Sequence, residues 1–213
     1  MRLLDLFCGA GGCSVGYHQA GFEVTGVDID PHRDYPFTFV QADAMEVLAD
    51  RDYLSAFDVV HASPPCQAFT RASHLRESQG HAPNTLDLLT PSRDLLQAWG
   101  GTWVLENVPG APMANPALMC GSAFGLRVRR HRWFDSPLLL MNSGCYHDQQ
   151  GRPVGVYHVM GDAIPNGGRT ARTLEEGQEA MGIDWMCWAD LKEAIPPAYT
   201  RYIGEQLLAA VAA

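Results

Sequence analysis

Long hydrophobic runs, paired cysteines and lysine are all scarce in this chain of 213 residues. No stretch has the roughly 18 uninterrupted apolar residues that a membrane-spanning helix needs, and the first residues lack the graded regions of a signal peptide. We therefore expect a cytoplasmic protein without a membrane partner. With 46% hydrophobic residues, the chain can bury one substantial core.

The six cysteines include no Cys-x-x-Cys pair, and their irregular spacing does not indicate a disulfide framework. Cys120, Cys145, His147 and Cys187 could in principle gather round a zinc ion. Nothing in their spacing favours such a site, so we expect no metal.

Acidic residues outnumber basic ones, which gives a formal net charge of −9 at pH 7. This charge argues mildly against a large nucleic-acid footprint, because non-specific affinity comes from cations that meet phosphates. Lysine occurs only at position 192, so arginine supplies nearly all of the positive charge. Four arginines crowd into residues 127–132. Because the arginine fork suits phosphate or carboxylate, this segment is compatible with a local nucleic-acid contact as well as with a solvated charged face.

The first 110 residues alternate between strand and helix patterns. We expect strands at 3–7, 22–27, 37–41, 57–62 and 102–105, and helices at 14–20, 44–48 and 92–99. This order predicts an α/β fold with a doubly wound, mostly parallel sheet. Residues 135–168 lose the periodicity and predict a small irregular insertion or a short hairpin, and helices return at 173–181, 188–194 and 199–212.

Residues suited to ligand binding follow the predicted strands, at the edge where a doubly wound sheet holds its ligands. The glycine-rich turn at 9–12 lets a ligand approach the backbone closely. Asp28 ends the second strand, where a ribose would be held, and Asp43 follows the third, near an adenine. No P-loop lysine or serine follows the turn, which argues against a triphosphate. A dinucleotide or S-adenosylmethionine would fit, although Asp28 alone would more simply be a cap or turn former.

Cys66 follows the fourth predicted strand directly after Pro64 and Pro65. The prolines stiffen the loop before any ligand binds, which suits a nucleophile, although an isolated cysteine is more often a small buried hydrophobic residue. Glu106 ends a later apolar strand. Apolar surroundings could keep its carboxyl protonated, its more ordinary role would be to pair with the arginine segment, and both can hold at once.

The chain resembles the cytosine-5 DNA methyltransferase family in four ordered motifs, which are Asp5-Leu6-Phe7-Cys8-Gly9-Ala10-Gly11-Gly12, Pro64-Pro65-Cys66-Gln67, Glu106-Asn107-Val108 and Arg130-His131-Arg132. The resemblance covers residue 3 to about 134 and resumes at 172–182 and 195–204. It implies the Rossmann-like fold of S-adenosylmethionine-dependent methyltransferases. Residues 1–134 would form the catalytic domain, 135–168 a reduced target-recognition region, and 169–213 the helices that complete the catalytic domain.

The resemblance implies methyl transfer from S-adenosylmethionine to C5 of cytosine in DNA. Cys66 would attack C6 of a base flipped out of the duplex, and Glu106 would hold N3 and the exocyclic amine. Arg130 and Arg132 would brace the base and the neighbouring backbone. The implied cofactor-binding residues are Phe7, Gly9, Gly11, Asp28, Ile29, Asp43 and Pro65, and the implied substrate-binding residues are Gln67 and Asn107.

The chain departs from the family pattern in three places. Val128 replaces the glutamine usual two residues before Arg130, Ala194 replaces a usual asparagine, and the region between Phe134 and Arg169 is far shorter than usual. Direct readout of several base pairs needs an element that fills the major groove, so we expect short or relaxed specificity, or a protein partner that supplies it.

Two alternatives stay open. One is methylation of cytosine in RNA or in a free nucleotide, because residues 66–71 are similar to the tRNA-methylating branch of the family. The other is a non-catalytic binding or regulatory subunit of the same fold. A compact enzyme of this kind would suit a phage or prophage, acting in the bacterial cytoplasm.

Overall fold

The structure is a computed structural model that describes residues 1–69, 86–156 and 167–211. The similarity of residues 66–71 to the tRNA-methylating branch therefore lies partly outside the described residues. Residues 157–166, in the later part of the expected target-recognition region, and Ala212, the last residue of the expected C-terminal helix, also lie outside the described residues.

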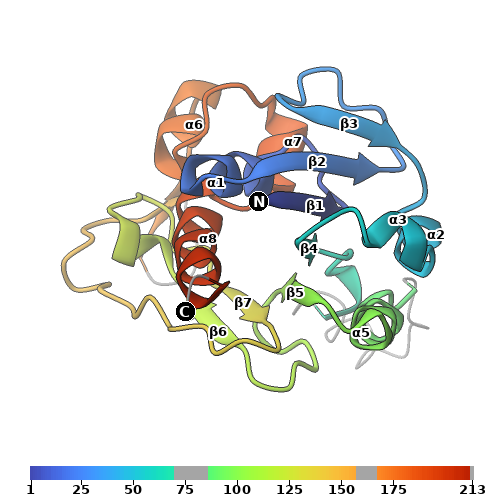
Figure 1. Cartoon of the computed structure of the whole chain (residues 1–213). Coiled ribbons are helices and arrows are strands. Elements are labelled where there is room, and N and C mark those ends of the chain that lie inside the picture. The colour runs from blue at the N-terminus through green and yellow to red at the C-terminus, as the bar shows by residue number, and fades with distance from the viewer. Residues whose placement is uncertain (70–85, 157–166, 212–213) are drawn as a thin grey trace, which may run out of the picture.

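A seven-stranded sheet lies at the centre of the described chain (Figure 1). Its strands are β1 (Arg2–Leu6), β2 (Glu23–Asp28), β3 (Thr38–Gln41), β4 (Val59–Ala62), β5 (Thr102–Asn107), β6 (Ala117–Met119) and β7 (Arg132–Asp135). They are ordered β3-β2-β1-β4-β5-β7-β6. The first five in sequence run parallel, and β7 is antiparallel to β5 and β6. The predicted α/β, doubly wound and mostly parallel fold is thereby confirmed.

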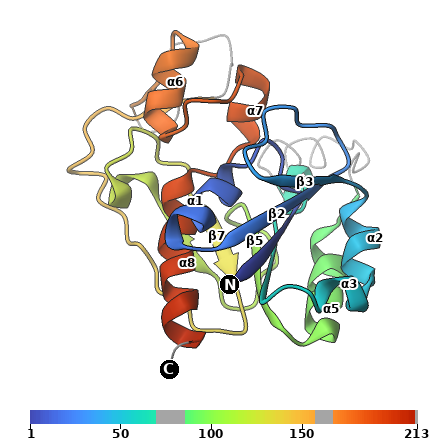
Figure 2. The ribbon, with the colours of Figure 1, turned by 45° about the horizontal axis from the view of Figure 1, so that its top comes forward.

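Helices cover both faces of this sheet (Figure 2). One face carries α1 (Gly12–Ala20) and α8 (Pro197–Val211), and the other carries α2 (Ala44–Ala49), α3 (Arg51–Leu54) and α5 (Leu89–Trp99). Strand residues alternate between these layers. Leu3, Val59 and Val104 pack in the core cluster of α1 and α8, whereas their successors Leu4, Val60 and Leu105 pack in the other cluster.

This alternation fixes the position of three buried polar residues. Asp5, His61 and Glu106 each lie two residues beyond a strand residue that faces α1 and α8. Because side chains in a strand alternate with a period of two, all three point to the same face of the sheet. The α1/α8 layer therefore covers a row of titratable side chains near the carboxyl ends of β1, β4 and β5.

The C-terminal helix packs directly against the first helix (Figure 1). A Cβ atom at Gly16 would collide with the Thr200 hydroxyl and the Pro197 carbonyl, so only glycine permits this approach. Thr200 Oγ1 donates to the Cys13 carbonyl at 2.8 Å. Two segments nearly 190 residues apart in sequence are thus joined in a single layer.

The remaining described elements are α6 (Leu174–Met181), α7 (Trp188–Glu193), β8 (Val154–Gly155) and β9 (Arg169–Thr170). Residues 136–153 contain neither helix nor strand, as expected for an irregular insertion. The strand β8 in this region pairs in parallel with β9, which a tight hairpin turn cannot connect, so this pair is not the short hairpin that the sequence also allowed, and residues 157–166 lie outside the described residues. None of the helices in the described ranges combines the length and the apolar character needed to cross a membrane.

Candidate active site at the carboxyl ends of the strands

Cys66 lies half-buried in the loop that follows β4. Asn107, at the end of β5, donates from Nδ2 to the Pro64 carbonyl at 2.9 Å. On the other side of the cysteine, the Phe69 N–H donates to the Cys66 carbonyl at 2.9 Å. The loop is therefore fixed at both ends, and the thiol is held beside the end of β5.

Charged residues from three other segments affect the thiol. Burial is the main cause that raises the pKa of Cys66, and the carboxylates of Glu106 and Glu193 raise it further. The Arg132 guanidinium lowers this pKa, and that of Arg130 lowers it more weakly. Sequence reasoning predicted three of these four neighbours and missed Glu193, which ends α7. The free thiol is accordingly protonated near neutral pH.

Glu106 and Arg132 form a buried ion pair, with Arg132 Nε 3.1 Å from Glu106 Oε1. The β5–β7 register explains it. Glu106 lies opposite Phe134, so Arg132, two residues from Phe134 along β7, is a diagonal neighbour on the same face. Burial raises the pKa of Glu106 to about 7, against the opposing charges of Arg132 and Arg130. The sequence allowed a protonatable carboxyl and an arginine partner to hold together at Glu106, and both are present.

Arg130 adopts a left-handed backbone with φ of 35°, a conformation that costs a non-glycine residue about 1–3 kcal/mol. Two contacts hold it there. Its Nη2 donates to the Lys192 carbonyl at 2.5 Å, and the buried Tyr199 hydroxyl donates to the Arg130 carbonyl at 2.9 Å. The C-terminal helices thus fix the backbone from which both motif arginines project.

The first part of the predicted cofactor-binding site is the turn after β1. Phe7 and Gly9 both have positive φ, 59° and 51°. The Gly9 N–H donates to Asp28 Oδ2 at 2.9 Å, and the Asp30 N–H donates to Asp28 Oδ1 at 3.1 Å. A Cβ atom at Gly9 would find no described atom within 4 Å. Ile29, which follows Asp28 in sequence, is 63% exposed. The backbone at Gly9 is therefore open, the Asp28 carboxylate bonded to it is mostly buried, and the neighbouring apolar side chain of Ile29 faces solvent.

The other predicted cofactor residues have structural tasks visible in the fold. Gly11 has φ of 89° and precedes α1, and a Cβ atom there would come within 3.1 Å of Pro36 and Tyr35. Asp43 is the N-cap of α2, since its Oδ1 accepts from the Met45 N–H at 2.8 Å. Pro65 is exposed beside Cys66. Their contact with a cofactor stays a prediction.

The two predicted substrate residues differ in position. Gln67 is exposed at the start of the short helical turn after Cys66. Asn107 is fully buried, and besides its bond to Pro64 its Oδ1 accepts from the Val108 N–H at 3.0 Å. Both ends of the Asn107 amide are therefore used within the protein, which favours a role in positioning the Cys66 loop over a contact with substrate.

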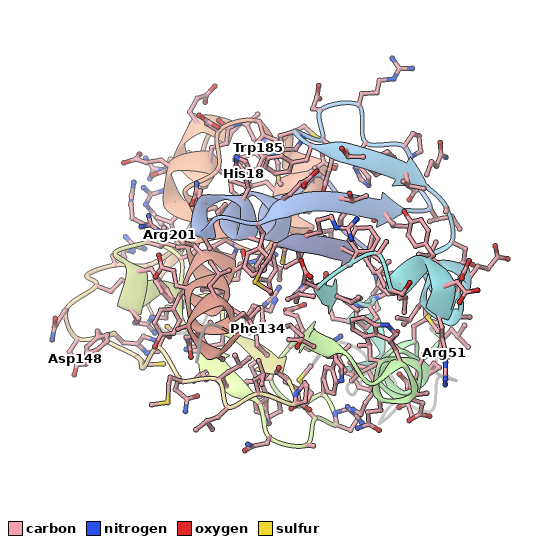
Figure 3. The ribbon with its side chains drawn as sticks, in the orientation of Figure 1. His18, Arg51, Phe134, Asp148, Trp185 and Arg201 are labelled. Carbon is pink, nitrogen blue, oxygen red and sulfur yellow. The ribbon has the colours of Figure 1, made fainter. Side chains whose placement is uncertain are left out.

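Sequence reasoning missed two residues behind the glycine turn. Asp5 is fully buried and accepts a hydrogen bond from the Ser14 hydroxyl, and burial raises its pKa to about 7. A carboxylate inside an apolar strand was the available signal. Trp185 donates from Nε1 to the Ala10 carbonyl at 2.8 Å and so attaches the segment between α6 and α7 to the turn (Figure 3). Nothing in the sequence pattern indicated that contact.

Comparison with known proteins identifies relatives of the first half of the chain. The family model for C-5 cytosine-specific DNA methylases matches residues 1–115, a range that includes Cys66 and Glu106. Type II methyltransferase M.HgiGI of Herpetosiphon aurantiacus is 32% identical over 124 residues, covering 54% of this chain and 95% of the relative. M.HgiDI of the same organism is also 32% identical over 124 residues, but only 39% of its length is covered. M1.HphI of Haemophilus parahaemolyticus is 36% identical over 87 residues, which cover 35% of this chain and 23% of the relative.

Solved structures resemble the whole described fold. A DNA modification methyltransferase encoded within a prophage (E. coli) has a TM-score of 0.68 with 16% identity, covering 100% of both chains. The Dnmt2 methyltransferase of S. pombe has a TM-score of 0.62 with 12% identity, covering 99% of each chain. At such low identities these likenesses concern the fold alone.

Proposed function

Because this chain belongs to the C-5 cytosine-specific DNA methylase family, we propose that it transfers a methyl group from S-adenosylmethionine to C5 of cytosine in DNA, through a covalent bond between Cys66 and C6. The supporting observation is that a half-buried thiol and the buried Glu106–Arg132 pair meet at adjacent strand ends. The match spans well under half of two of the three relatives described, so the activity of the whole protein is our proposal.

The turn after β1 fits the proposed cofactor. S-adenosylmethionine supplies an electrophilic methyl group when bound. The Asp28 carboxylate would accept the ribose hydroxyls, the Ile29 side chain would pack against the adenine, and the open backbone at Gly9 would allow close approach. Phe7, Gly11, Asp43 and Pro65 complete the proposed set of cofactor-binding residues.

The proposed reaction assigns one proton to Glu106. The Cys66 thiol, protonated in the free protein, would first lose its proton to water. As the thiolate adds to C6 of the flipped base, Glu106 would give its proton to N3, and the displaced ring electrons would make C5 nucleophilic. C5 would then take the methyl group, and S-adenosylhomocysteine would leave. Loss of the C5 proton to water would break the Cys66–C6 bond, and the N3 proton would return to Glu106. The ion pair with Arg132 stabilises the carboxylate that forms when Glu106 donates.

We further propose that residues 1–134 and 169–213 form one catalytic domain, with 135–168 as its reduced target-recognition region. Apart from Asp135 at the end of β7, the described part of this region contributes only β8, two residues long, and irregular backbone. Because reading several base pairs needs an element that fills the major groove, we propose short or relaxed specificity, or a protein partner that supplies it.

The test is incubation with labelled S-adenosylmethionine and duplex DNA, followed by nucleoside analysis. We expect label in 5-methylcytosine, its loss in Cys66→Ala, and its retention in Cys187→Ala, a matched exposed cysteine. A duplex that carries 5-fluorocytosine should hold the protein covalently, because no C5 proton can leave and release the thiol.

Several outcomes would contradict the proposal. Label that survives in Cys66→Ala would exclude the covalent step, and label on an exocyclic nitrogen would exclude the reaction class. Label on RNA or deoxycytidine monophosphate, with none on duplex DNA, would instead support the alternative substrates. Cofactor binding without any transfer would indicate a non-catalytic subunit.

A further inference from the structure

Two cysteines and two histidines gather at a place that the proposed reaction does not use. The ligand atoms of Cys120, His131, Cys145 and His147 all lie within 4.8 Å of one another. They come from three segments. Cys120 follows β6, His131 directly precedes β7, and Cys145 and His147 belong to the irregular stretch 136–153.

The distances between these atoms are close to those of a tetrahedral metal site. Cys120 Sγ lies 3.2 Å from His147 Nε2, and Cys145 Sγ lies 3.3 Å from His131 Nε2. With Zn–S of about 2.3 Å and Zn–N of about 2.0 Å, neighbouring sulfur and nitrogen ligands are about 3.5 Å apart. The two thiol–imidazole pairs would separate by only a few tenths of an ångström to accept an ion between them.

We propose that Cys120, His131, Cys145 and His147 bind a single zinc ion in a closed structural site. Thiolate and imidazole ligands together select zinc over harder cations. Four protein ligands leave no open position, so the ion would hold the structure rather than activate water. Binding releases one proton from each thiol, and both imidazoles bind in their neutral form. Cys145 is exposed, which gives the metal a route from solvent, whereas Cys120 is buried.

Hydrogen bonds around the sulfur of Cys120 already support such a site. The Ser122 hydroxyl lies 3.0 Å from Cys120 Sγ and accepts from the Tyr146 N–H at 2.9 Å. The Cys120 N–H donates to the Ser143 hydroxyl at 3.1 Å. Partners of this kind orient metal ligands and are a regular part of metal centres. They align residues 143–147 with the end of β6.

The positions of the four ligands indicate which segments the ion would stabilise. Residues 136–153 contain neither strand nor helix. Asp148, next to His147, lies at the outer edge of the molecule, on the opposite side from Arg51 (Figure 3). A metal crosslink would stabilise this stretch, which has no regular secondary structure. Because His131 stands between Arg130 and Arg132, the same crosslink would anchor the backbone that presents the motif arginines.

This proposal replaces the expectation, from spacing alone, that the chain binds no metal. Three of the four residues considered from the sequence do meet in the structure. The fourth, Cys187, instead donates to Asp190 Oδ2 at 3.1 Å, and His131 takes its place in the cluster.

The test is the metal content of the full chain, purified under reducing conditions without chelator. Mass spectrometry of the metal should find one zinc per chain in the wild type and in Cys187→Ser, and less than a tenth of that in the double variant Cys145→Ser/His147→Gln. Cobalt added to the metal-free wild type should give the intense visible absorption of tetrahedral cobalt with thiolate ligands. A chelator should lower the melting temperature of the wild type but not that of the double variant.

Absence of zinc from the wild type, together with no tetrahedral cobalt spectrum, would overturn the proposal. So would full zinc content in the double variant, or a disulfide between Cys120 and Cys145 in a metal-free protein. The cobalt spectrum needs no variant, so it decides the question even if the double variant fails to fold. Metal content is measured without substrate, so its outcome is separate from that of the methyl-transfer assay.

Discussion

Replacing Glu106 by glutamine tests the central electrostatic feature of the proposed active site. The carboxyl lies 4% exposed beside Arg132, and burial raises its pKa from 4.5 to about 7. Glutamine keeps the size and polarity of the side chain but has no proton to lose. The comparison of Glu106→Gln with the wild type therefore isolates the ionisation of this one residue.

The sign and size of the effect follow from linkage. Below pH 4.5 the carboxyl is protonated in both states, and as the pH rises the unfolded chain loses this proton first. The stability that the protonated form contributes is therefore lost progressively until the pH exceeds the folded pKa of about 7. At about 1.4 kcal/mol per tenfold change in acidity, the complete loss is about 3 kcal/mol. The free energy of unfolding of Glu106→Gln should thus rise relative to the wild type by about 2–3 kcal/mol between about pH 5 and pH 8.

Urea unfolding at a series of pH values measures this difference. Asp5 and His61 also titrate and are present in both proteins. The Glu106 charge is a smaller cause of the raised pKa of Asp5, so the Asp5 contribution changes slightly in the variant. Loss of the Arg132 partner adds an offset that does not vary with pH. Glu46→Gln, in the exposed first turn of α2, should show no such slope. Parallel stability curves for wild type and Glu106→Gln would refute a buried carboxyl with a raised pKa.

In the methylation assay, kcat of Glu106→Gln should fall about 10²–10⁴-fold, because glutamine cannot protonate N3. The Kd for S-adenosylmethionine should stay unchanged.

Two further predictions concern residues that act from behind the site. Asn107→Leu removes the donor to the Pro64 carbonyl, and loss of this hydrogen bond costs about 1–2 kcal/mol. We therefore expect kcat to fall about tenfold with KM unchanged. The control Asn115→Leu, which replaces an exposed asparagine, should leave kcat and KM unaltered. A rise in KM alone would indicate a substrate contact instead. Burial lowers the pKa of His61 to about 3, so its contribution to stability is lost as the pH falls from 6.5 towards 3. His61→Asn should flatten acid unfolding over this range, and an unchanged acid midpoint would count against a neutral, buried imidazole.

The sequence predicted the parallel half of the sheet well, because each of these strands is a continuous apolar run bounded by turn residues. It missed β6, an apolar strand of only three residues, and it missed β7 for the opposite reason. β7 begins with Arg132 and ends with Asp135, and both are buried only because partners reach them. Ala114 donates its N–H to Asp135 Oδ2 at 3.1 Å, and Arg132 pairs with Glu106. No local pattern distinguishes such a strand from a charged loop.

For the candidate site, the sequence predicted which strand ends carry polar residues but not what each polar group contacts. Asp43 and Asn107 illustrate the limit. Both stand where a ligand contact was expected, yet the hydrogen bonds described for them cap a helix and fix a loop. Such partners depend on how the elements pack in three dimensions, as with His131, a ligand in the proposed zinc site, whose neighbours in the cluster are at least eleven residues away in sequence.

The C-terminal helix links the two halves of the proposed reaction. Thr200 bonds to the Cys13 carbonyl in α1, directly after the glycine turn, and the adjacent Tyr199 bonds to the Arg130 carbonyl. One turn of α8 therefore fixes both the start of the helix behind the proposed methyl donor and the backbone of the motif arginines. Because methyl transfer needs donor and acceptor aligned to within a fraction of an ångström, we expect the proposed reaction to depend on the long-range contacts of α8 as well as on Cys66. The match to the family model ends at residue 115 and does not reach this helix.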